Sequence, residues 1–417
     1  MVVDFCRFVI ELQNPFQVVI PMRILALTPS FYGWTGAAVN ERQLITVLAK
    51  KVEKCYVVTF VSFKHFLAKR KKILKELEGL PENMTVIVLP LPKRITLAVC
   101  LGMIAVSCIV SIVGLMLRAL RKVDLVYIRN SLLAIGFLTF SSLAKRTIVK
   151  IPAIIEDEIL GRGFAELIFK WMTKFLDRLA LAKAGKIAVN GFPMYFEIAK
   201  RRSYIRKDRP LMIPPGVNLH LIENIKRQVS AKQSTTINVG FLGLLEWWQG
   251  VDILARAVAL LKKNVPNVKL VIIGDGSLRP LVEGICKAYN LQYEITGFLP
   301  HQEALKRAAT LDVLAVPSKR FSTTESNIPI KVIEAWALSL PVVITKHKVF
   351  VINGILDGEH VVYCEPEPTS VAEALIRVLT NEDLKTRLKT NGPKLAMQFD
   401  YDKIAENILE SLSRDES

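Results

Sequence analysis

The chain has 417 residues, which is too long for one compact core and predicts two domains of roughly 200 residues each. Its six cysteines are scattered without a CxxC pair or a Cys/His cluster, which argues against a disulfide framework and a structural zinc site. The formal net charge is +18, and residues 1–210 carry this whole surplus, with 33 Lys and Arg against 15 Asp and Glu. A one-sided basic half implies a polyanionic neighbour, either nucleic acid or an acidic membrane surface.

Short apolar runs alternate with helical segments along the chain, which is typical of a parallel α/β fold. Residues 1–21 precede the first run and are interpreted as an N-terminal extension or a misassigned start. The strands predicted in the first half are 23–27, 56–60, 85–89, 125–128, 153–155 and 187–189. Those in the second half are 238–242, 269–273, 293–296, 313–316, 342–344 and 361–363. The pattern predicts two Rossmann-like, doubly wound parallel-sheet domains.

The segment 213–217 reads Ile-Pro-Pro-Gly-Val and breaks this alternation, so it is the predicted hinge. The first domain is expected to cover 22–212 and the second 213–400. Residues 401–417 are expected to form a C-terminal helix and tail. The helix, at about 401–411, is amphipathic and should pack on one of the domains.

Residues 95–117 form an uncharged, strongly apolar run between Arg94 and Arg118. The run is long enough to span a bilayer, but one crossing would place strands of the same sheet on opposite sides of the membrane. It is therefore either an apolar helix that covers the sheet or a segment that docks the basic domain on lipid, with 131–144 beside it. We adopt the membrane-associating interpretation.

The second half holds the most specific pattern. In chain order it reads GFLGLLEWWQGVDIL, KLVIIGDGSLRPL, ITGFLPHQEALKRAATLDVLAVPSK and ESNIPIKVIEAWALSLPVVIT. Each piece is a strand that ends in a small or glycine-rich turn and opens a helix. Open parallel sheets bind ligands at these carboxyl ends, where glycines let the backbone approach a diphosphate and helix N-termini supply amide donors.

With these motifs the chain resembles the retaining glycosyltransferases of family 4, which have the GT-B fold of two Rossmann-like domains facing across a cleft. The resemblance covers 22–415 and is strongest over 238–345. The first half agrees through PSFYGWTGAAVNERQL, a glycine loop, and KVDLVYIRNSLLAIG, which matches the strand and loop of the acceptor cleft. The hinge sequence LMIPPGVNLHLI matches the family's linker.

The resemblance implies a set of donor-binding residues. Glu334 aligns with the glutamate that binds the ribose hydroxyls, although a charge that only pairs with the helix dipole is the alternative. The segment 296–299 aligns with the part that holds the base. The implied donor-binding residues are Glu334, Gly33, Gly36, Gly243, Gln249, Gly250, Gly274, Phe298, Leu299, Ser326, Asn327 and Ile328.

The chain departs from the family at positions that carry charge. A second glutamate is usual eight positions before Glu334, where this chain has Ser326. Either a loop shift returns Glu325 to the donor sugar, or Ser326, Asn327 and backbone amides take over. The family's phosphate-binding Arg and Lys would fall at 244 and 249, which are leucine and glutamine here.

Lys331 is the predicted replacement for these cations, with Lys319, Arg320 and Arg129 as other candidates. Because Lys331 lies three residues before Glu334, a surface ion pair between the two is the competing interpretation.

On the acceptor side, many relatives carry a histidine in the stretch that matches IPAIIEDEIL, and this chain has none there. Asp157 is the predicted acceptor-orienting base, against the alternative of a solvated acidic turn, and Arg129 is the predicted acceptor contact. Trp247 and Trp248 either stack on a sugar or base or pack in the core. The catalytic candidates are therefore Glu325, Asp157 and Lys331.

These observations predict a hexosyltransferase of family 4 type that works in polysaccharide or glycolipid biosynthesis. The resemblance implies that it uses a UDP- or GDP-linked sugar, needs no cofactor or metal, and acts with retention. The basic, apolar first half predicts a lipid-linked or glycan acceptor. The expected location is cytoplasmic, peripheral or monotopic on the cytoplasmic face of an anionic membrane. A degenerate relative that only binds nucleotide or a partner protein is the alternative. Nucleic acid is not expected as a partner, since the chain shows no recognisable reading motif.

Overall fold

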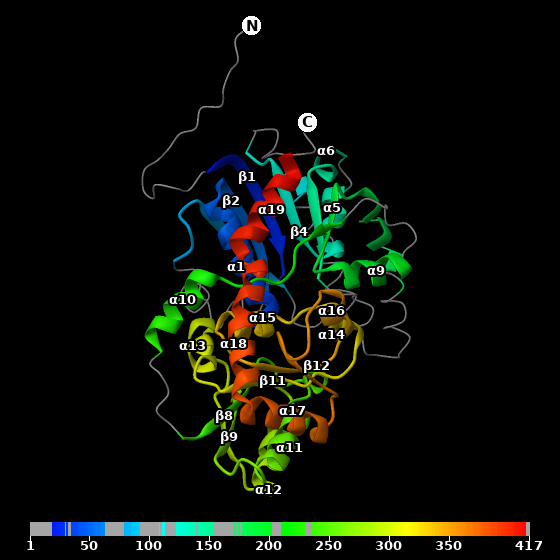
Figure 1. The fold of residues 1–417 in the computed structure, drawn as a ribbon. Coiled ribbons are helices and arrows are strands. Elements are labelled where there is room, and N and C mark those ends of the chain that lie inside the picture. Colours follow the sequence, from blue (N-terminus) through cyan, green and yellow to red (C-terminus); the bar gives the residue numbers. More distant parts are fainter. Residues whose placement is uncertain are drawn as a thin grey trace.

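Figure 1 shows the computed structural model of the chain, in which two α/β lobes lie one above the other. The structure describes residues 19–29, 31, 35–62, 79–91, 108, 111–112, 122–138, 141–152, 171, 174–175, 177–179, 181–201, 210–229 and 235–413. Most of the predicted extension 1–21 and of the apolar run 95–117 lies outside these residues. Within the described ranges, no helix combines the length and the apolarity that crossing a bilayer requires.

The upper lobe is built on a seven-stranded parallel sheet in the order β3-β2-β1-β4-β5-β6-β7. Its strands read as continuous apolar runs because helices cover both faces, as parallel sheets require. The strands are β1 (Ile20–Thr28), β2 (Val52–Ser62), β3 (Met84–Leu91), β4 (Leu125–Arg129), β5 (Thr147–Ile151), β6 (Lys186–Val189) and β7 (Leu211–Met212). The described helices of this lobe are α1 (Gly36–Lys50), α5 (Ser131–Leu138), α6 (Ser141–Ala144) and α9 (Phe192–Arg201).

The lower lobe is built on a six-stranded parallel sheet in the order β10-β9-β8-β11-β12-β13. The strands are β8 (Ile237–Leu242), β9 (Val268–Ile273), β10 (Gln292–Ile295), β11 (Val313–Val316), β12 (Val342–Thr345) and β13 (Val362–Cys364). The helices are α10 (Leu219–Gln228), α11 (Val251–Leu261), α12 (Arg279–Ala288), α13 (His301–Ala308), α14 (Ser322–Ser326), α15 (Ile330–Ala337), α16 (Lys348–Ile352), α17 (Pro368–Thr380) and α18 (Glu382–Ala396), with the 3-10 turns η1 (Trp247–Gln249) and η2 (Met397–Phe399). One apolar core fills each face of this sheet.

Each sheet reverses its winding direction once near its middle, between β1 and β4 above and between β8 and β11 below. The chain winds outward in one direction from the first strand of each lobe, and then returns to the other side of that strand. A crevice opens outside the carboxyl ends of the strands at such a switch point, and ligands of doubly wound sheets bind there. The two-sheet α/β prediction is confirmed.

The lobes are joined twice, and the two crossings lie side by side. The segment 213–217 carries the chain down, and η2 carries it back into α19 (Tyr401–Ser413), which packs on the core of the upper lobe beside α1. Val217 N donates to Phe399 O at 2.8 Å, and Tyr401 N donates to Val217 O at 3.1 Å. The Tyr401 hydroxyl donates to Asn40 Oδ1 at 3.0 Å. The C-terminal helix therefore ties the end of the second lobe to the first.

The fifth strand lies at Thr147–Ile151, whereas the sequence pattern favours 153–155, a range outside the described residues. The pattern misses β5 because Lys150 interrupts its apolar run. In the structure, Lys150 is fully buried and donates to Glu41 Oε1 at 2.9 Å. A charge can occupy a central strand when a buried partner of opposite sign compensates it.

Candidate active site

Two loops at the carboxyl ends of β8 and β9 pack against each other through their backbones. Leu245 N donates to Asp275 O at 3.0 Å, and Leu278 N donates to Leu245 O at 2.9 Å. Gly274 has φ +146°, and a Cβ there would overlap the carbonyl oxygen of Gly243. Only glycine permits this approach. The glycines therefore bring the two loops together directly beside the switch point.

Two helices of the lower lobe begin next to these loops without a side-chain cap. Gly250, in the left-handed region at φ 69°, leads into α11, and Pro329 leads into α15. The first amides of such helices have no intrahelical acceptor, and the helix dipole makes the helix end attractive to anions. The sequence places no acidic residue in the first turn of α15. The second lobe thus has the local structure that binds a phosphate-bearing ligand.

Lys331, in the first turn of α15, is buried with its side chain directed at the glycine loop. Its Nζ donates to Gln249 Oε1 at 2.9 Å and lies 4.3 Å from the ring centroid of Phe241. A Cβ on Gly243 would stand only 2.8 Å from this ammonium group, so glycine makes room for it. Burial lowers the pKa of Lys331 to about 7, although nearby Glu334 acts in the opposite direction.

The position of Lys331 excludes the interpretation of this residue as one half of a surface ion pair with Glu334. Lys331 is not a surface residue and forms no ion pair with Glu334, since its amine bonds to Gln249 instead. Position 249, where the family carries a cation, is therefore occupied by an amide that holds the amine of Lys331. The amine of Lys331, which comes from α15, therefore lies next to this position. Gln249 also gives the amine a single neutral partner, so an incoming anion could replace or share that contact.

Glu334 lies one turn further along α15 and is also buried. Its Oε1 is 2.6 Å from His301 Nε2, at the start of α13. His301 is a site residue that the sequence reasoning missed. The available signal was its place directly after the segment 296–299, which the resemblance assigns to the base. Phe298 in that segment is 49% exposed, and Leu299 is partly buried against the core.

Asn327 forms the described polar contact between the lobes at this site. Its Oδ1 accepts a hydrogen bond of 2.9 Å from Asn190 Nδ2, directly after β6 of the upper lobe. Gly36, at the start of α1, also faces the start of α15, because a Cβ on it would lie 3.3 Å from Ile330 Cγ2. Ser326 and Ile328 are buried beside Asn327. The upper lobe therefore contacts the start of α15 and the residues just before it at two points.

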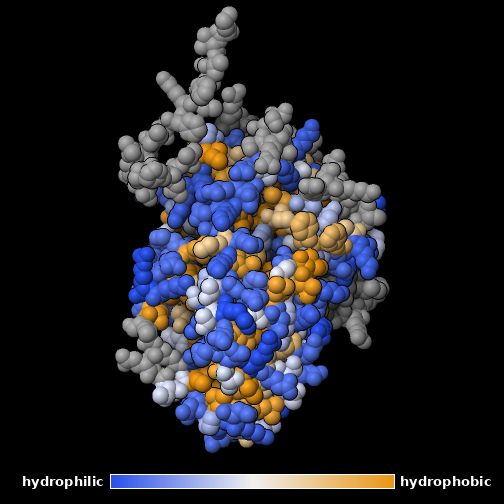
Figure 2. All heavy atoms as spheres, in the orientation of Figure 1, coloured by the Kyte–Doolittle hydropathy of each residue, from blue (hydrophilic) through white to orange (hydrophobic). Residues whose placement is uncertain are grey.

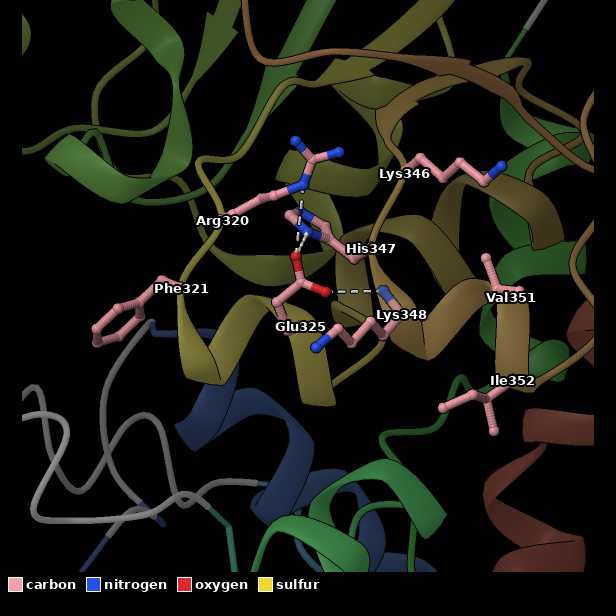
Figure 3. A pocket seen from close by; sticks show the side chains of 8 residues that line it. All are labelled: Arg320, Phe321, Glu325, Lys346, His347, Lys348, Val351 and Ile352. Atoms are coloured by element: carbon pink, nitrogen blue, oxygen red, sulfur yellow. Dashed lines mark hydrogen bonds and ion pairs between the residues drawn. The ribbon is translucent and has the colours of Figure 1, made fainter.

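Glu325 turns toward the loop after β12. Its Oε2 accepts from Lys348 N at 2.9 Å, its Oε1 lies 3.1 Å from His347 Nδ1, and Arg320 stands 3.7 Å away. Burial would raise the pKa of Glu325, but the Lys348 amide and His347 outweigh it and lower the pKa. Figure 3 shows this carboxylate at the centre of a hollow. Both oxygens thus have partners within the loop.

On the upper lobe, Arg129 is held at the end of β4 by a buried network. Its Nη1 is 2.7 Å from Glu41 Oε1, and Lys150 and the Tyr127 hydroxyl bind the same carboxylate at 2.9 Å each. Burial would raise the pKa of Glu41, but Lys150 and Arg129 outweigh it and lower the pKa. Two basic side chains share one carboxylate, and burial lowers the pKa of Lys150 although Glu41 acts in the opposite direction.

The remaining predicted residues divide between described and undescribed parts of the chain. Trp247 is 39% exposed and makes edge contacts with Trp248 and Phe321, at centroid distances of 5.8 and 6.0 Å. Gly33 and Asp157 lie outside the described residues, so their predicted roles stay predictions. Within the described ranges, no group of three metal-ligating side chains is present.

Comparison with known proteins finds one family model and several relatives that resemble parts of the chain. Residues 222–395 match the family model described as glycosyl transferases group 1. An uncharacterized glycosyltransferase of Methanocaldococcus jannaschii is 26% identical over 258 residues, which are 60% of this chain and 62% of the relative. The chain therefore matches less than two thirds of that relative's length.

Two solved structures share the fold over nearly the whole chain. Sucrose-phosphate synthase from Thermosynechococcus elongatus superposes with a TM-score of 0.67 at 16% identity, covering 94% of this chain and 98% of the other. HepE of Anabaena, solved in complex with UDP, gives 0.65 at 18% identity and covers 95% and 100%. The chain thus has the GT-B fold that its motifs predict.

Proposed function

We propose that the protein transfers a hexosyl group from a nucleotide-sugar to a lipid-linked or membrane glycan acceptor, because residues 222–395 match the family model of the glycosyl transferases group 1. The observation that carries the proposal is a buried cation and a buried carboxylate one turn apart on α15. Lys331 lies beside the glycine loop at the switch point of the lower sheet, and Glu334 contacts His301 at the start of α13. Transfer proceeds with retention of configuration, as in the family 4 enzymes that the chain resembles.

Glu334 binds the ribose of the donor in this proposal. A carboxylate can accept hydrogen bonds from two neighbouring hydroxyls, and bonds to an ionised acceptor are stronger than neutral ones. His301 fixes the carboxylate at 2.6 Å and thereby sets its orientation before the donor arrives. Phe298 and Leu299 lie on the segment that leads from β10 to His301, which supports their assignment to the base. HepE, which shares the fold, is solved with UDP, and this supports a uridine or similar nucleotide.

Lys331 stabilises the departing nucleoside diphosphate. As the bond from the anomeric carbon to the diphosphate oxygen breaks, negative charge develops on the leaving group, and a fixed cation in a desolvated site stabilises it strongly. Lys331 is held in place by Gln249, and the α11 and α15 N-termini add amide donors. A bound diphosphate would raise the pKa of Lys331 from its value near 7, so donor binding keeps the ammonium charged. The reaction as proposed uses no metal ion, because these groups supply the positive charge.

For the donor sugar, the geometry favours Ser326 and Asn327 over Glu325. Both carboxylate oxygens of Glu325 already have partners in the loop after β12. Asn327 instead lies at the contact with Asn190 of the upper lobe, where donor and acceptor sides meet. Asp157 keeps its proposed role as the group that orients the acceptor hydroxyl.

In this proposal the first domain holds the part of the acceptor that carries the reacting hydroxyl. Its half of the chain carries the whole charge surplus of +18, which suits docking on an anionic membrane surface on the cytoplasmic face. Arg129 lies at the end of β4, where it pairs with Glu41 beside Lys150. Closure of the two lobes, guided by the Asn190–Asn327 contact, would bring the acceptor hydroxyl to the anomeric carbon.

The proposal is tested by a transfer assay with the full chain, a panel of UDP- and GDP-sugars and a polyprenyl phosphate acceptor. Product formation with one donor, and an anomeric proton coupling that matches that donor, would support it. The matched control is Glu303→Gln, an exposed carboxylate change on α13, against Glu334→Gln in the site. Absence of both transfer and donor hydrolysis across the whole panel would refute the proposal that the protein is a glycosyltransferase.

A second candidate is a degenerate relative that binds nucleotide without turnover. It is motivated by Leu244 and Gln249, where the family's two phosphate-binding cations are missing. Nucleotide binding without hydrolysis or transfer from any donor would favour this candidate over the enzyme.

A further inference from the structure

A hollow of about 660 Å³ lies at the carboxyl ends of β11 and β12, beside the candidate active site. It adjoins that site at Phe321, whose ring contacts Trp247. In Figure 3, Phe321 stands on one side of the hollow and Val351 and Ile352 stand on the other, with Glu325 between them. None of the proposed donor contacts requires this space.

The hollow carries positive charge that is only partly neutralised. Arg320 binds Glu365 through both guanidinium nitrogens, at 2.7 and 3.0 Å. Lys346 and Lys348 both line the hollow, and the Lys346 ammonium lies 5.8 Å from the ring centroid of Tyr363. In Figure 3 the two lysine side chains extend in opposite directions at its edge. Among the described residues, no carboxylate lies within 4.0 Å of either lysine ammonium. Two exposed ammonium groups are therefore available to an anion.

The other wall of the hollow is apolar and continues onto the upper lobe. Val351 and Ile352 on α16 are 54% and 55% exposed. Helix α9 contacts α16 and adds Phe192 and Phe196, whose rings stack at 6.4 Å while more than half of each side chain stays exposed. Figure 2 shows apolar residues gathered where α9 and α16 meet. Exposed apolar side chains thus lie both in the hollow and on the neighbouring helix of the upper lobe.

We propose that this hollow binds a phosphate group carried on an apolar chain. Lys346 and Lys348 hold the phosphate, and the chain runs along Val351 and Ile352 onto the phenylalanines of α9. The lysines suit the phosphate, since ammonium groups bind phosphate as point charges. The exposed aromatic and aliphatic side chains suit the apolar chain, because burying them against a lipid chain removes apolar surface from water and is favourable. A nucleotide or a nucleic acid would leave the apolar wall uncovered.

The inference deepens the proposed function, on which it rests for the identity of the acceptor, by naming the part of a lipid-linked acceptor that the protein holds. The same phosphate chemistry occurs on a polyprenyl phosphate and on the headgroups of an anionic bilayer. The surface joins both lobes, so a lipid bound there would stand at the mouth of the cleft where transfer is proposed. Its binding requires neither a donor nor turnover.

The test is co-sedimentation of the full chain with three kinds of vesicle at one ionic strength. They are phosphatidylcholine alone, phosphatidylcholine with a polyprenyl phosphate, and phosphatidylcholine with phosphatidylglycerol. The double variant Lys346→Gln/Lys348→Gln removes the two ammonium groups. Its matched control, Lys287→Gln/Lys389→Gln, removes the same charge from exposed positions on α12 and α18.

We expect wild type to bind the polyprenyl phosphate vesicles, and the site double variant to bind them roughly 30-fold more weakly. The control double variant should stay within about twofold of wild type. Ile352→Ser should weaken binding more than Leu281→Ser, which changes an exposed leucine on α12. Equal binding to phosphatidylglycerol vesicles, with the same dependence on the two lysines, would support the site and assign its phosphate to bilayer headgroups.

Two results would overturn the inference. In one, both double variants lose affinity equally or bind like wild type, which means that membrane binding comes from general charge or from the basic first half. In the other, wild type binds polyprenyl phosphate vesicles no better than phosphatidylcholine alone. A failure of sugar transfer leaves these binding results unaffected, so the two proposals can fail separately.

Discussion

Replacing Lys331 with methionine separates a functional cation from a structural one. Methionine keeps most of the length and shape of the side chain, and it removes the ammonium that donates to Gln249 Oε1. If Lys331 stabilises the fold, the variant should be less stable than wild type. If Lys331 instead serves to bind the donor's diphosphate, the variant should be more stable, because burying an uncompensated charge is costly, and it should bind nucleotide more weakly.

The stability effect follows from the pKa. Burial lowers the pKa of Lys331 from its ordinary 10.5 to about 7. The unfolded chain therefore holds a proton that the folded protein releases between these values, and wild-type stability rises with pH across that window. Below about pH 7 the buried ammonium costs up to roughly 5 kcal/mol. Lys331→Met should thus be more stable than wild type by up to a few kcal/mol at neutral pH, and the gain should vanish near pH 10.5.

The binding effect has the opposite sign. A hydrogen bond from a charged group contributes about 1.5–3 kcal/mol, so the variant should bind the nucleoside diphosphate roughly 10- to 150-fold more weakly. Because a bound diphosphate raises the pKa of Lys331, wild-type affinity should be full below about pH 7 and fall as the pH rises above it. The variant should lack this pH dependence.

Calorimetric titration with UDP and GDP, in buffers of different ionisation enthalpy, measures both the affinity and the proton uptake. Urea unfolding at several pH values measures the stability. Lys389→Met, an exposed change on α18, is the control and should alter neither quantity by much. If Lys331→Met unfolds more easily than wild type and binds nucleotide equally well, the cation is structural and the reasoning is refuted.

Three further changes test the site and its supports. Glu334→Ala should weaken nucleotide binding at least tenfold without altering the far-ultraviolet circular dichroism, while Glu303→Ala on the exposed face of α13 should bind normally. Gly274→Ala should destabilise the protein by about 2–4 kcal/mol in urea, because its φ of +146° and the neighbouring carbonyl oxygen leave no room for a Cβ; Gly284→Ala, in open space on α12, should instead be neutral or stabilising. Lys150→Met should cost about 1–3 kcal/mol in the same assay, since it removes the amine that donates to Glu41 while Arg129 still pairs with this carboxylate, and a gain in stability would contradict that network.

The sequence predicts the architecture because the strands of a parallel sheet are buried on both faces and therefore read as apolar runs. β1 and β8 are found at their predicted places for this reason. The position of β5 is not predicted correctly, because the charge of Lys150 interrupts an otherwise apolar strand. Its partner Glu41 lies 109 residues away, and only tertiary structure brings them together.

The contacts within the candidate site also depend on residues that are far apart in the sequence. The resemblance could indicate that a cation was missing at 249 and that Lys331 was a candidate to replace it. Whether the lysine amine reached that position depended on the path of a loop 82 residues away, which local patterns do not encode. The orientation of Glu325 toward Lys348 and His347, and the contact between Glu334 and His301, are likewise long-range packing results. The roles of Gly33 and Asp157 stay predictions.

A crystal structure of the protein with a bound nucleoside diphosphate tests the central claim most directly. We expect the ribose hydroxyls within hydrogen-bond distance of Glu334, and the diphosphate within hydrogen-bond distance of Lys331 Nζ, next to the glycine loop at Gly243. A nucleotide bound away from the switch point of the lower sheet, or bound there with its phosphates turned away from Lys331, would contradict the proposed site.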